Sequence, residues 1–130
     1  METYETGNNE HQISLAVNIF TFGLAASSAT IKIVDPPTVG ISVAQSEDAS
    51  GDIITQAIGK ASDIQNKRLT ILTKIDLIGS LEDRKNAYND IDATYTLSGG
   101  SDGLQTYVDP LKSVDDDFTT VLLAKPIDLI

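Results

Sequence analysis

The sequence predicts a mostly β protein: a single antiparallel β-sandwich or barrel-like domain with one short helix, and an α+β fold as the alternative. Three observations lead to this prediction. Apolar residues make up 41% of the 130-residue chain but aromatics only 5%, and there is no Trp, so the core must consist of Ile, Leu, Val and Ala. Of these residues, Ile and Val are β-branched and favour strands. Several stretches also alternate apolar and polar residues, and no repeat or linker divides the chain.

The N-terminal third predicts a flexible terminus followed by a hairpin. Residues 1–11 have no apolar period, so we expect a flexible N-terminus there and a single β-rich domain over residues 12–130. Alternation from Ile13 to Ile19 predicts a strand that begins near Gln12. Residues 23–28 are small and turn-like, and a second alternating run follows at 29–33. We therefore expect the two runs to pair.

One stretch in this region resembles a secretory signal. Residues 13–26 are largely apolar and end in small residues. The preceding segment contains three glutamates and no Lys or Arg, whereas a signal peptide begins with a basic region. We therefore interpret the stretch as a strand of the mature protein.

The next segment combines a strand with a helix candidate. Pro36 and Pro37 indicate an edge or crossover, after which the alternation of Val39, Ile41 and Val43 predicts a third strand. Apolar residues recur at helical spacing over residues 52–65, with Asp52 as N-cap, which predicts a helix. A further strand remains the alternative there, because a glycine lies in mid-pattern.

Residues 68–79 and 87–98 give the most regular alternation in the chain. With a turn around residues 82–84, they predict an antiparallel hairpin with Lys74 opposite Asp92 and Ile75 opposite Ile91. This register also places Asp76 close to Asp90.

The C-terminal third predicts shorter elements. We expect a short strand over residues 104–108, one helical turn that starts at Asp109 and Pro110, and a last strand over residues 118–124. Because residues 121–124 are apolar on both faces, that strand is predicted to be covered on both sides. Pro126 is expected to interrupt it, and the final Leu129 and Ile130 to be tied down.

Charge and cysteine content exclude several classes of function. The absence of Cys excludes disulfides, thiolate zinc sites and a cysteine nucleophile. A formal net charge of −10 opposes binding to nucleic acids and to anionic membranes, so we expect neither partner. Residues 60–85 alone carry more bases than acids; we interpret this segment as pairing with its acidic neighbours in the chain, and a weak contact with an acidic protein or with a second copy of the chain is the alternative.

Residues with catalytic or metal-binding chemistry are few. The only histidine, His11, lies in the expected flexible terminus, and the stretch from Gly51 to Ala61 fails as a phosphate loop in its spacing and lacks the Ser or Thr that holds magnesium. Residues 99–103 are interpreted as a turn. Three acidic runs have the oxygen ligands that calcium prefers but not EF-hand spacing, and we interpret them as solvated surface: residues 47–48, 89–92 and 115–117. We therefore predict no catalytic, cofactor-binding or metal-binding residue, and no cofactor.

These observations lead to two hypotheses about function. The first is a soluble, non-catalytic structural or protein-interaction domain, with a second copy of the chain or an unidentified protein as its partner. The alternative is a protein that binds a small apolar, lipid-like ligand, because strands rich in Ile, Leu and Val can enclose a cavity instead of filling it.

Overall fold

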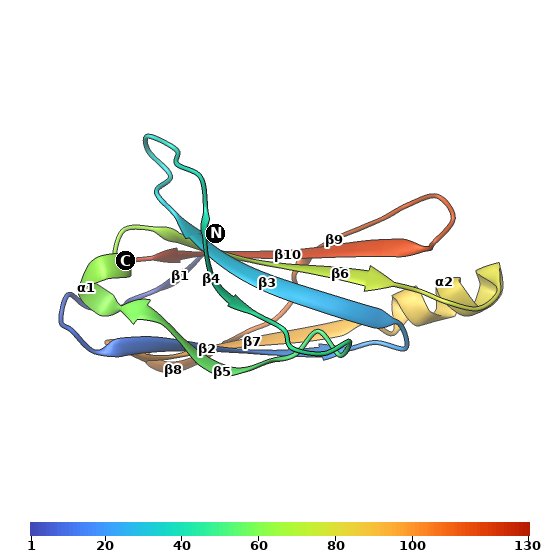
Figure 1. Cartoon of the computed structure of the whole chain (residues 1–130), viewed down its shortest axis with the longest axis horizontal. Coiled ribbons are helices and arrows are strands. Elements are labelled where there is room, and N and C mark those ends of the chain that lie inside the picture. Colours follow the sequence, from blue (N-terminus) through green and yellow to red (C-terminus); the bar gives the residue numbers. More distant parts are fainter.

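The computed structural model describes the whole chain, residues 1–130. It contains two β-sheets packed face to face, with mostly antiparallel strands and few helices. In Figure 1 the two layers are seen from the side, with β3, β6 and β10 in one layer and β2, β5 and β7 in the other. The prediction of a mostly β, sandwich-like fold is confirmed.

The first sheet, called sheet A here, has six strands. Their order is β1-β10-β6-β3-β4, and β9 also pairs with β10. Only β1 runs parallel to its neighbour. The strands are β1 (Glu2–Tyr4), β3 (Leu24–Lys32), β4 (Ile41–Gln45), β6 (Arg68–Asp76), β9 (Leu111–Val114) and β10 (Thr120–Leu129).

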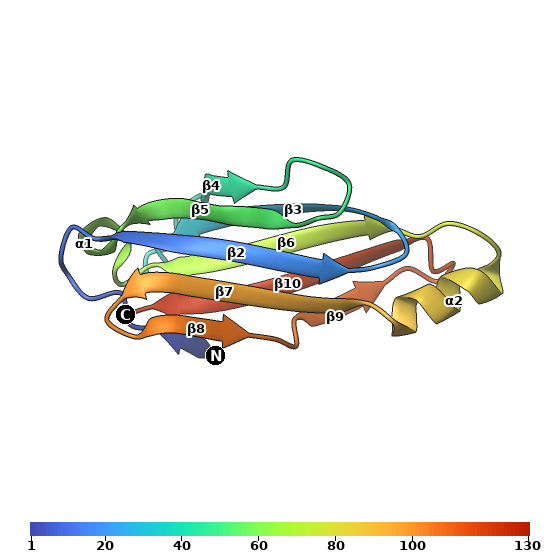
Figure 2. The same ribbon diagram turned by 90° about the horizontal axis from the view of Figure 1, so that it is seen from below.

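The second sheet, sheet B, has four antiparallel strands in the order β5-β2-β7-β8. Figure 2 shows this order from the outer side of the sheet. The strands are β2 (Gln12–Phe20), β5 (Ile53–Lys60), β7 (Asp92–Gly100) and β8 (Gly103–Tyr107).

Two short helices lie at opposite ends of the sandwich (Figure 2). Helix α1 (Ala61–Ile64) follows β5, and α2 (Leu81–Asn89) connects β6 in sheet A to β7 in sheet B. A capping box begins α2: the Ser80 side chain accepts a hydrogen bond from the Asp83 N–H, and the Asp83 carboxylate accepts one from the Ser80 N–H. Neither helix has the length and apolar character needed to cross a membrane.

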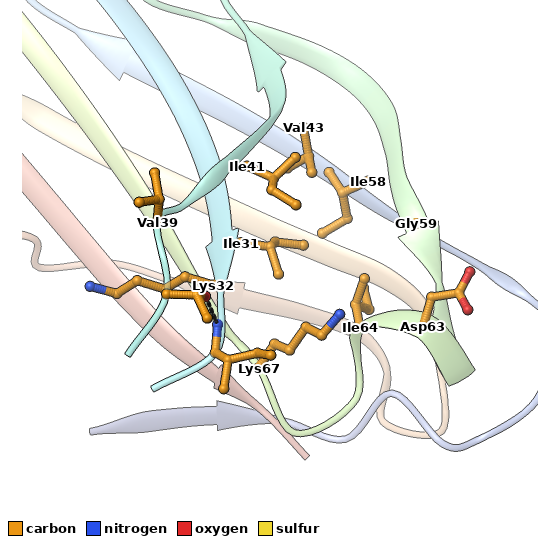
Figure 3. Close-up of a pocket in the computed structure, with 12 residues that line it drawn as sticks. Ile31, Lys32, Val39, Ile41, Val43, Ile58, Gly59, Asp63, Ile64 and Lys67 are labelled. Carbon is orange, nitrogen blue, oxygen red and sulfur yellow. Dashed lines mark hydrogen bonds between the residues drawn. The ribbon is translucent and has the colours of Figure 1, made fainter. Parts of the chain in front are cut away.

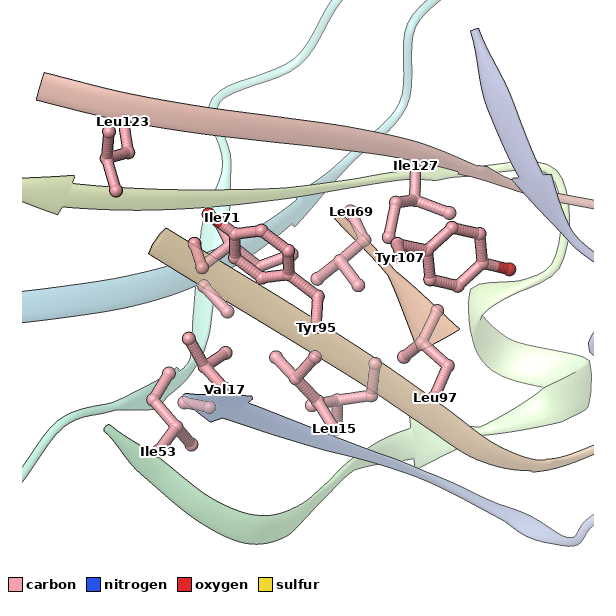
Figure 4. Packing of buried hydrophobic residues seen from close by; sticks show 14 of the residues in the cluster. Leu15, Val17, Ile53, Leu69, Ile71, Tyr95, Leu97, Tyr107, Leu123 and Ile127 are labelled. Carbon is pink, nitrogen blue, oxygen red and sulfur yellow. The ribbon is translucent and has the colours of Figure 1, made fainter. Parts of the chain in front are cut away.

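The core lies between the two sheets and follows the alternation of the central strands. On β2, residues 13, 15, 17 and 19 are buried, and on β6 residues 69, 71, 73 and 75. Fully burying one aliphatic side chain of this size contributes roughly 1.5–3 kcal/mol. Figure 4 shows side chains from both layers meeting in this space, among them Leu15, Ile71 and Tyr95.

Both predicted hairpins are wrong, for the same reason. Strands β2 and β3 lie in different sheets, as do β6 and β7. Lys74 lies opposite Leu122 and Ala26, and not opposite Asp92; Ile75 lies opposite Val121 and Ala25. The parity of each strand was predicted correctly, but alternation shows which residues are buried and does not identify the neighbouring strand. The chain between β6 and β7 forms α2 and crosses to the other sheet.

The predicted helix over residues 52–65 is also wrong, and the strand alternative is correct for most of it. Residues 53–60 form β5, and only the four residues of α1 are helical. Asp52 caps no helix; its carboxylate accepts a hydrogen bond from the Ile19 N–H at 2.7 Å. This contact joins the start of β5 to β2, so a neighbouring strand overrides the helical spacing of the apolar residues.

The chain termini are paired with each other. The sequence predicts that the first strand begins near Gln12. In the structure a strand comes before it, because β1 pairs with β10 and Tyr4 is fully buried. Leu129 and Ile130 are tied down as predicted, since the Ile130 N–H donates to the Tyr4 carbonyl and the Leu129 N–H to that of Lys67.

Three details of the C-terminal third differ from expectation. Residues 104–107 lie in β8 as predicted, but Asp109 and Pro110 precede the strand β9 and start no helical turn. Leu122 is 52% exposed, so β10 is covered on one face only. Pro126 lies inside β10, between the stretch that pairs with β9 and the stretch that pairs with β1. That edge of β10 has no partner there, and the strand continues through the proline.

Two buried tyrosines provide a test of the packing. The Tyr95 hydroxyl has no hydrogen-bond partner, and burial raises the pKa of this side chain well above its usual value. The Tyr4 hydroxyl donates to the Gly103 carbonyl at 2.6 Å and accepts from the Gly100 N–H at 2.9 Å. An unpaired buried hydroxyl costs free energy, whereas a paired one contributes.

We therefore expect Tyr95→Phe to leave the free energy of unfolding unchanged or to raise it by up to about 1 kcal/mol, and Tyr4→Phe to lower it by about 0.5–1.5 kcal/mol. Urea denaturation followed by circular dichroism measures both. A loss larger than about 1 kcal/mol in Tyr95→Phe would contradict this assignment, because it would mean that the hydroxyl has a partner.

Candidate functional site

A pocket lies where the edge of sheet A faces the edge of sheet B, beside α1. Its volume is about 420 Å³. Figure 3 shows the lining side chains, which come from β3 and β4 on one side and from β5 and α1 on the other. The lining residues are Ile31, Lys32, Ile33, Thr38, Val39, Ile41, Val43, Ile58, Gly59, Asp63, Ile64 and Lys67.

The floor of the pocket is aliphatic and belongs to the core. Ile31, Ile58 and Ile64 are only 5–6% exposed. They come from β3, β5 and α1, so the floor joins the two sheets at this end of the sandwich. A ligand on this floor would extend the hydrophobic core outward.

The outer wall is also apolar but is open to solvent. Val39 is 91% exposed and Ile41 is 71% exposed. The alternation of Val39, Ile41 and Val43 predicted a strand, yet β4 begins only at Ile41 and nothing in the chain covers the Val39 and Ile41 side chains. Large apolar side chains grouped around a hollow are typical of binding surfaces.

The loop before Val39 is held by hydrogen bonds to its own start. The Ile33 N–H donates to the Thr38 hydroxyl at 3.0 Å, and the Thr38 N–H donates to the Ile33 carbonyl at 3.0 Å. These two bonds close the loop that carries Val39. The wall of the pocket is therefore a fixed part of the fold and does not depend on a ligand to form.

Gly59 is required where β5 passes over α1. Its φ is +149°, and a Cβ at this position would lie 2.8 Å from Cγ2 of Ile64. A larger residue would push Ile64 into the pocket or strain the backbone. The mid-pattern glycine that weakened the helix prediction thus preserves the floor of the pocket.

The charged residues of the pocket lie at its rim. They are Lys32, Lys67 and Asp63, and none of them forms an ion pair. In Figure 3 the Lys67 side chain extends along the pocket towards Ile64, while Lys32 points outward from the opposite side. The rim thus has two ammonium groups and one carboxylate around an apolar interior.

The reactive groups of the pocket lining are limited to the amines of Lys32 and Lys67, the Asp63 carboxylate and the Thr38 hydroxyl. The lining contains no His, Cys, Ser or Tyr, and its one hydroxyl, that of Thr38, accepts a hydrogen bond from the loop backbone. The chemistry that this arrangement supports is the binding of an apolar group.

The residues singled out in the sequence lie elsewhere. His11 is exposed in the loop before β2. The carboxylate of Asp115 accepts hydrogen bonds from Thr119, and that of Asp48 from Ser50; these bonds lower the pKa of both acids. Asp76 ends a strand of sheet A and Asp92 begins one of sheet B. No three acidic, His or Cys side chains come together as metal ligands.

Sequence reasoning identified no residue of the pocket as functional. Ile31 belongs to the alternating run at residues 29–33, and Ile58 to the apolar pattern over residues 52–65. Both patterns predict buried side chains, which is correct for the floor of the pocket. These two residues line the pocket together with Ile64 because β3 and β5 lie in opposite sheets. The predicted helix over residues 52–65 did not allow for this arrangement. The run of Val39 and Ile41 directly after two prolines was the one available signal.

Comparison with known proteins identifies no relative. No family model, curated protein or solved structure matches this chain. The interpretation of the pocket therefore depends on its own geometry and chemistry.

Proposed function

We propose that this protein is a non-catalytic binding domain that holds a small apolar, lipid-like molecule in the pocket between β4 and α1. The observation that carries the proposal is the set of exposed apolar residues, above all Val39, arranged around a hollow with a core floor. Exposing such residues to water is unfavourable, and a bound aliphatic chain would remove them from it.

The size of the pocket agrees with this role. Pockets for small molecules usually measure roughly 300–1,000 Å³ and are lined mainly by hydrophobic side chains. This pocket has about 420 Å³, and seven of its twelve lining residues are hydrophobic. A filled sandwich core alone would favour a purely structural domain, whereas this opening at the edge favours the ligand-binding alternative.

A titration with the neutral apolar dye Nile red tests the proposal. We expect saturable binding with increased fluorescence, and an at least tenfold weaker affinity in Val39→Asp, because a carboxylate in the wall must lose water when the ligand binds. Val39 is 91% exposed, so this variant is expected to keep its free energy of unfolding within about 0.5 kcal/mol.

The matched control is Leu104→Asp, which places the same carboxylate at a 71% exposed leucine of β8, at the edge of sheet B away from the pocket, and we expect it to bind the dye as the parent protein does. Absence of saturable binding, or equal loss in both variants, would reject the pocket as the binding site.

A second candidate function is a protein-interaction domain whose partner is another copy of the chain. Leu72, Leu111 and Leu122 are 50–69% exposed on the outer face of sheet A. In the strand register Leu72 and Leu111 both lie opposite Ala124, so this leucine patch is continuous.

Charge favours a second copy as the partner on this leucine patch. The charges beside it are balanced, since Arg68 pairs with Asp128 and Lys74 lies 4.0 Å from Asp76. The whole molecule carries a formal net charge of −10, so the electrostatic repulsion between two copies is smallest when they meet through a neutral face. A two-fold contact would bring the same patch of each copy together.

Sedimentation velocity over a range of protein concentrations tests this second function. We expect a dimer that dissociates on dilution, and a monomer for Leu122→Asp at every concentration, because the carboxylate would be desolvated in the contact. A parent protein that stays monomeric at millimolar concentration would exclude the self-association.

A further inference from the structure

The rim of the pocket differs from the rest of the protein surface in its charge. The chain has nine basic and nineteen acidic side chains, yet two of the three charged residues that line the pocket are lysines. The pocket therefore lies at a locally positive place on a strongly negative molecule.

Neither lysine forms an ion pair within the protein. The three ion pairs of the structure use Arg68, Lys74 and Lys125. Lys32 and Lys67 are absent from these pairs and donate no side-chain hydrogen bond, although both are partly buried. The nearest acid in the lining, Asp63, forms no ion pair with Lys67.

The position of Lys67 suits an amphiphilic ligand. Figure 3 shows its side chain lying along the pocket with the ammonium group near Ile64, and Lys32 on the opposite side of the opening. The alkyl stem of a lysine packs on apolar surface while its charged group stays at the water boundary. An aliphatic tail on the isoleucine floor would thus place its head group beside the Lys67 ammonium group.

We propose that the ligand is a free single-chain amphiphile with an anionic head group, such as a fatty acid, whose carboxylate is bound by Lys67. This inference rests on the proposed ligand-binding function and names the class of ligand. An anionic bilayer as the source of the head group is disfavoured, because the net charge of −10 repels such a surface.

Competition with Nile red distinguishes the head groups. Decanoate and 1-decanol each have ten carbon atoms, and the first ends in a charged carboxylate where the second ends in an uncharged hydroxyl. We expect both molecules to displace the dye. Lys67→Gln should weaken the affinity for decanoate about two- to fivefold, which is the effect typical of one exposed ion pair, and should leave the affinity for 1-decanol unchanged. Lys32→Gln should have little effect on either competition, because the Lys32 side chain points away from the opening (Figure 3).

Lys85→Gln is the matched control, because it removes the same charge from α2 at the opposite end of the sandwich (Figure 1). It should change neither competition. If 1-decanol displaces the dye but Lys67→Gln leaves the affinity for decanoate unchanged, the assignment of the head group is wrong, and only the apolar pocket remains supported. If neither amphiphile displaces the dye, both proposals fail.

Discussion

Hydrophobic packing between two sheets is the constraint on which the rest of the structure depends. Every second residue of β2, β6, β7 and β10 is buried between the layers, so the two sheets are stable only together. The connections follow from this requirement. Helix α2 carries the chain from one layer to the other, and the pairing of β1 with β10 brings the first strand to the edge of the last.

The same packing explains why this apolar pocket lies at the edge of the sandwich. Along the middle of the sandwich the inner faces fill the space between the sheets, as Figure 4 shows for Leu15 and Ile71. At the β4 and β5 edge no backbone ladder joins the sheets; one side-chain hydrogen bond, from Gln56 to the Val43 carbonyl at 3.4 Å, links the two strands, and the single turn of α1 lies beside them. Ile31, Ile58 and Ile64 therefore remain accessible at the end of the core. The loop that carries Val39 extends this apolar surface instead of closing it.

The sequence predicted the fold class and the buried faces, because both depend on composition and on alternation within a strand. It did not predict which strands are neighbours. Ile75 and Ile91 have the parity of a hairpin, but the Ser80 and Asp83 capping box, which is visible in the sequence, begins a helix between them. The pocket could not be predicted, because it forms only when β3 and β5 lie in different sheets and face each other at one edge of the sandwich. In the sequence, the exposed Val39 and Ile41 show the same alternation as residues on the buried face of a strand.

The central claim is that a ligand binds at the open end of the core without entering its middle. Isoleucine methyl NMR during addition of 1-decanol tests it most directly, because the alcohol occupies the pocket whatever the charge of the rim. We predict large, saturable shifts for Ile31, Ile58 and Ile64, which line the pocket, and small ones for Ile71 and Ile75, which are fully buried elsewhere. Shifts of equal size at all five residues, or none at the pocket residues, would contradict the account.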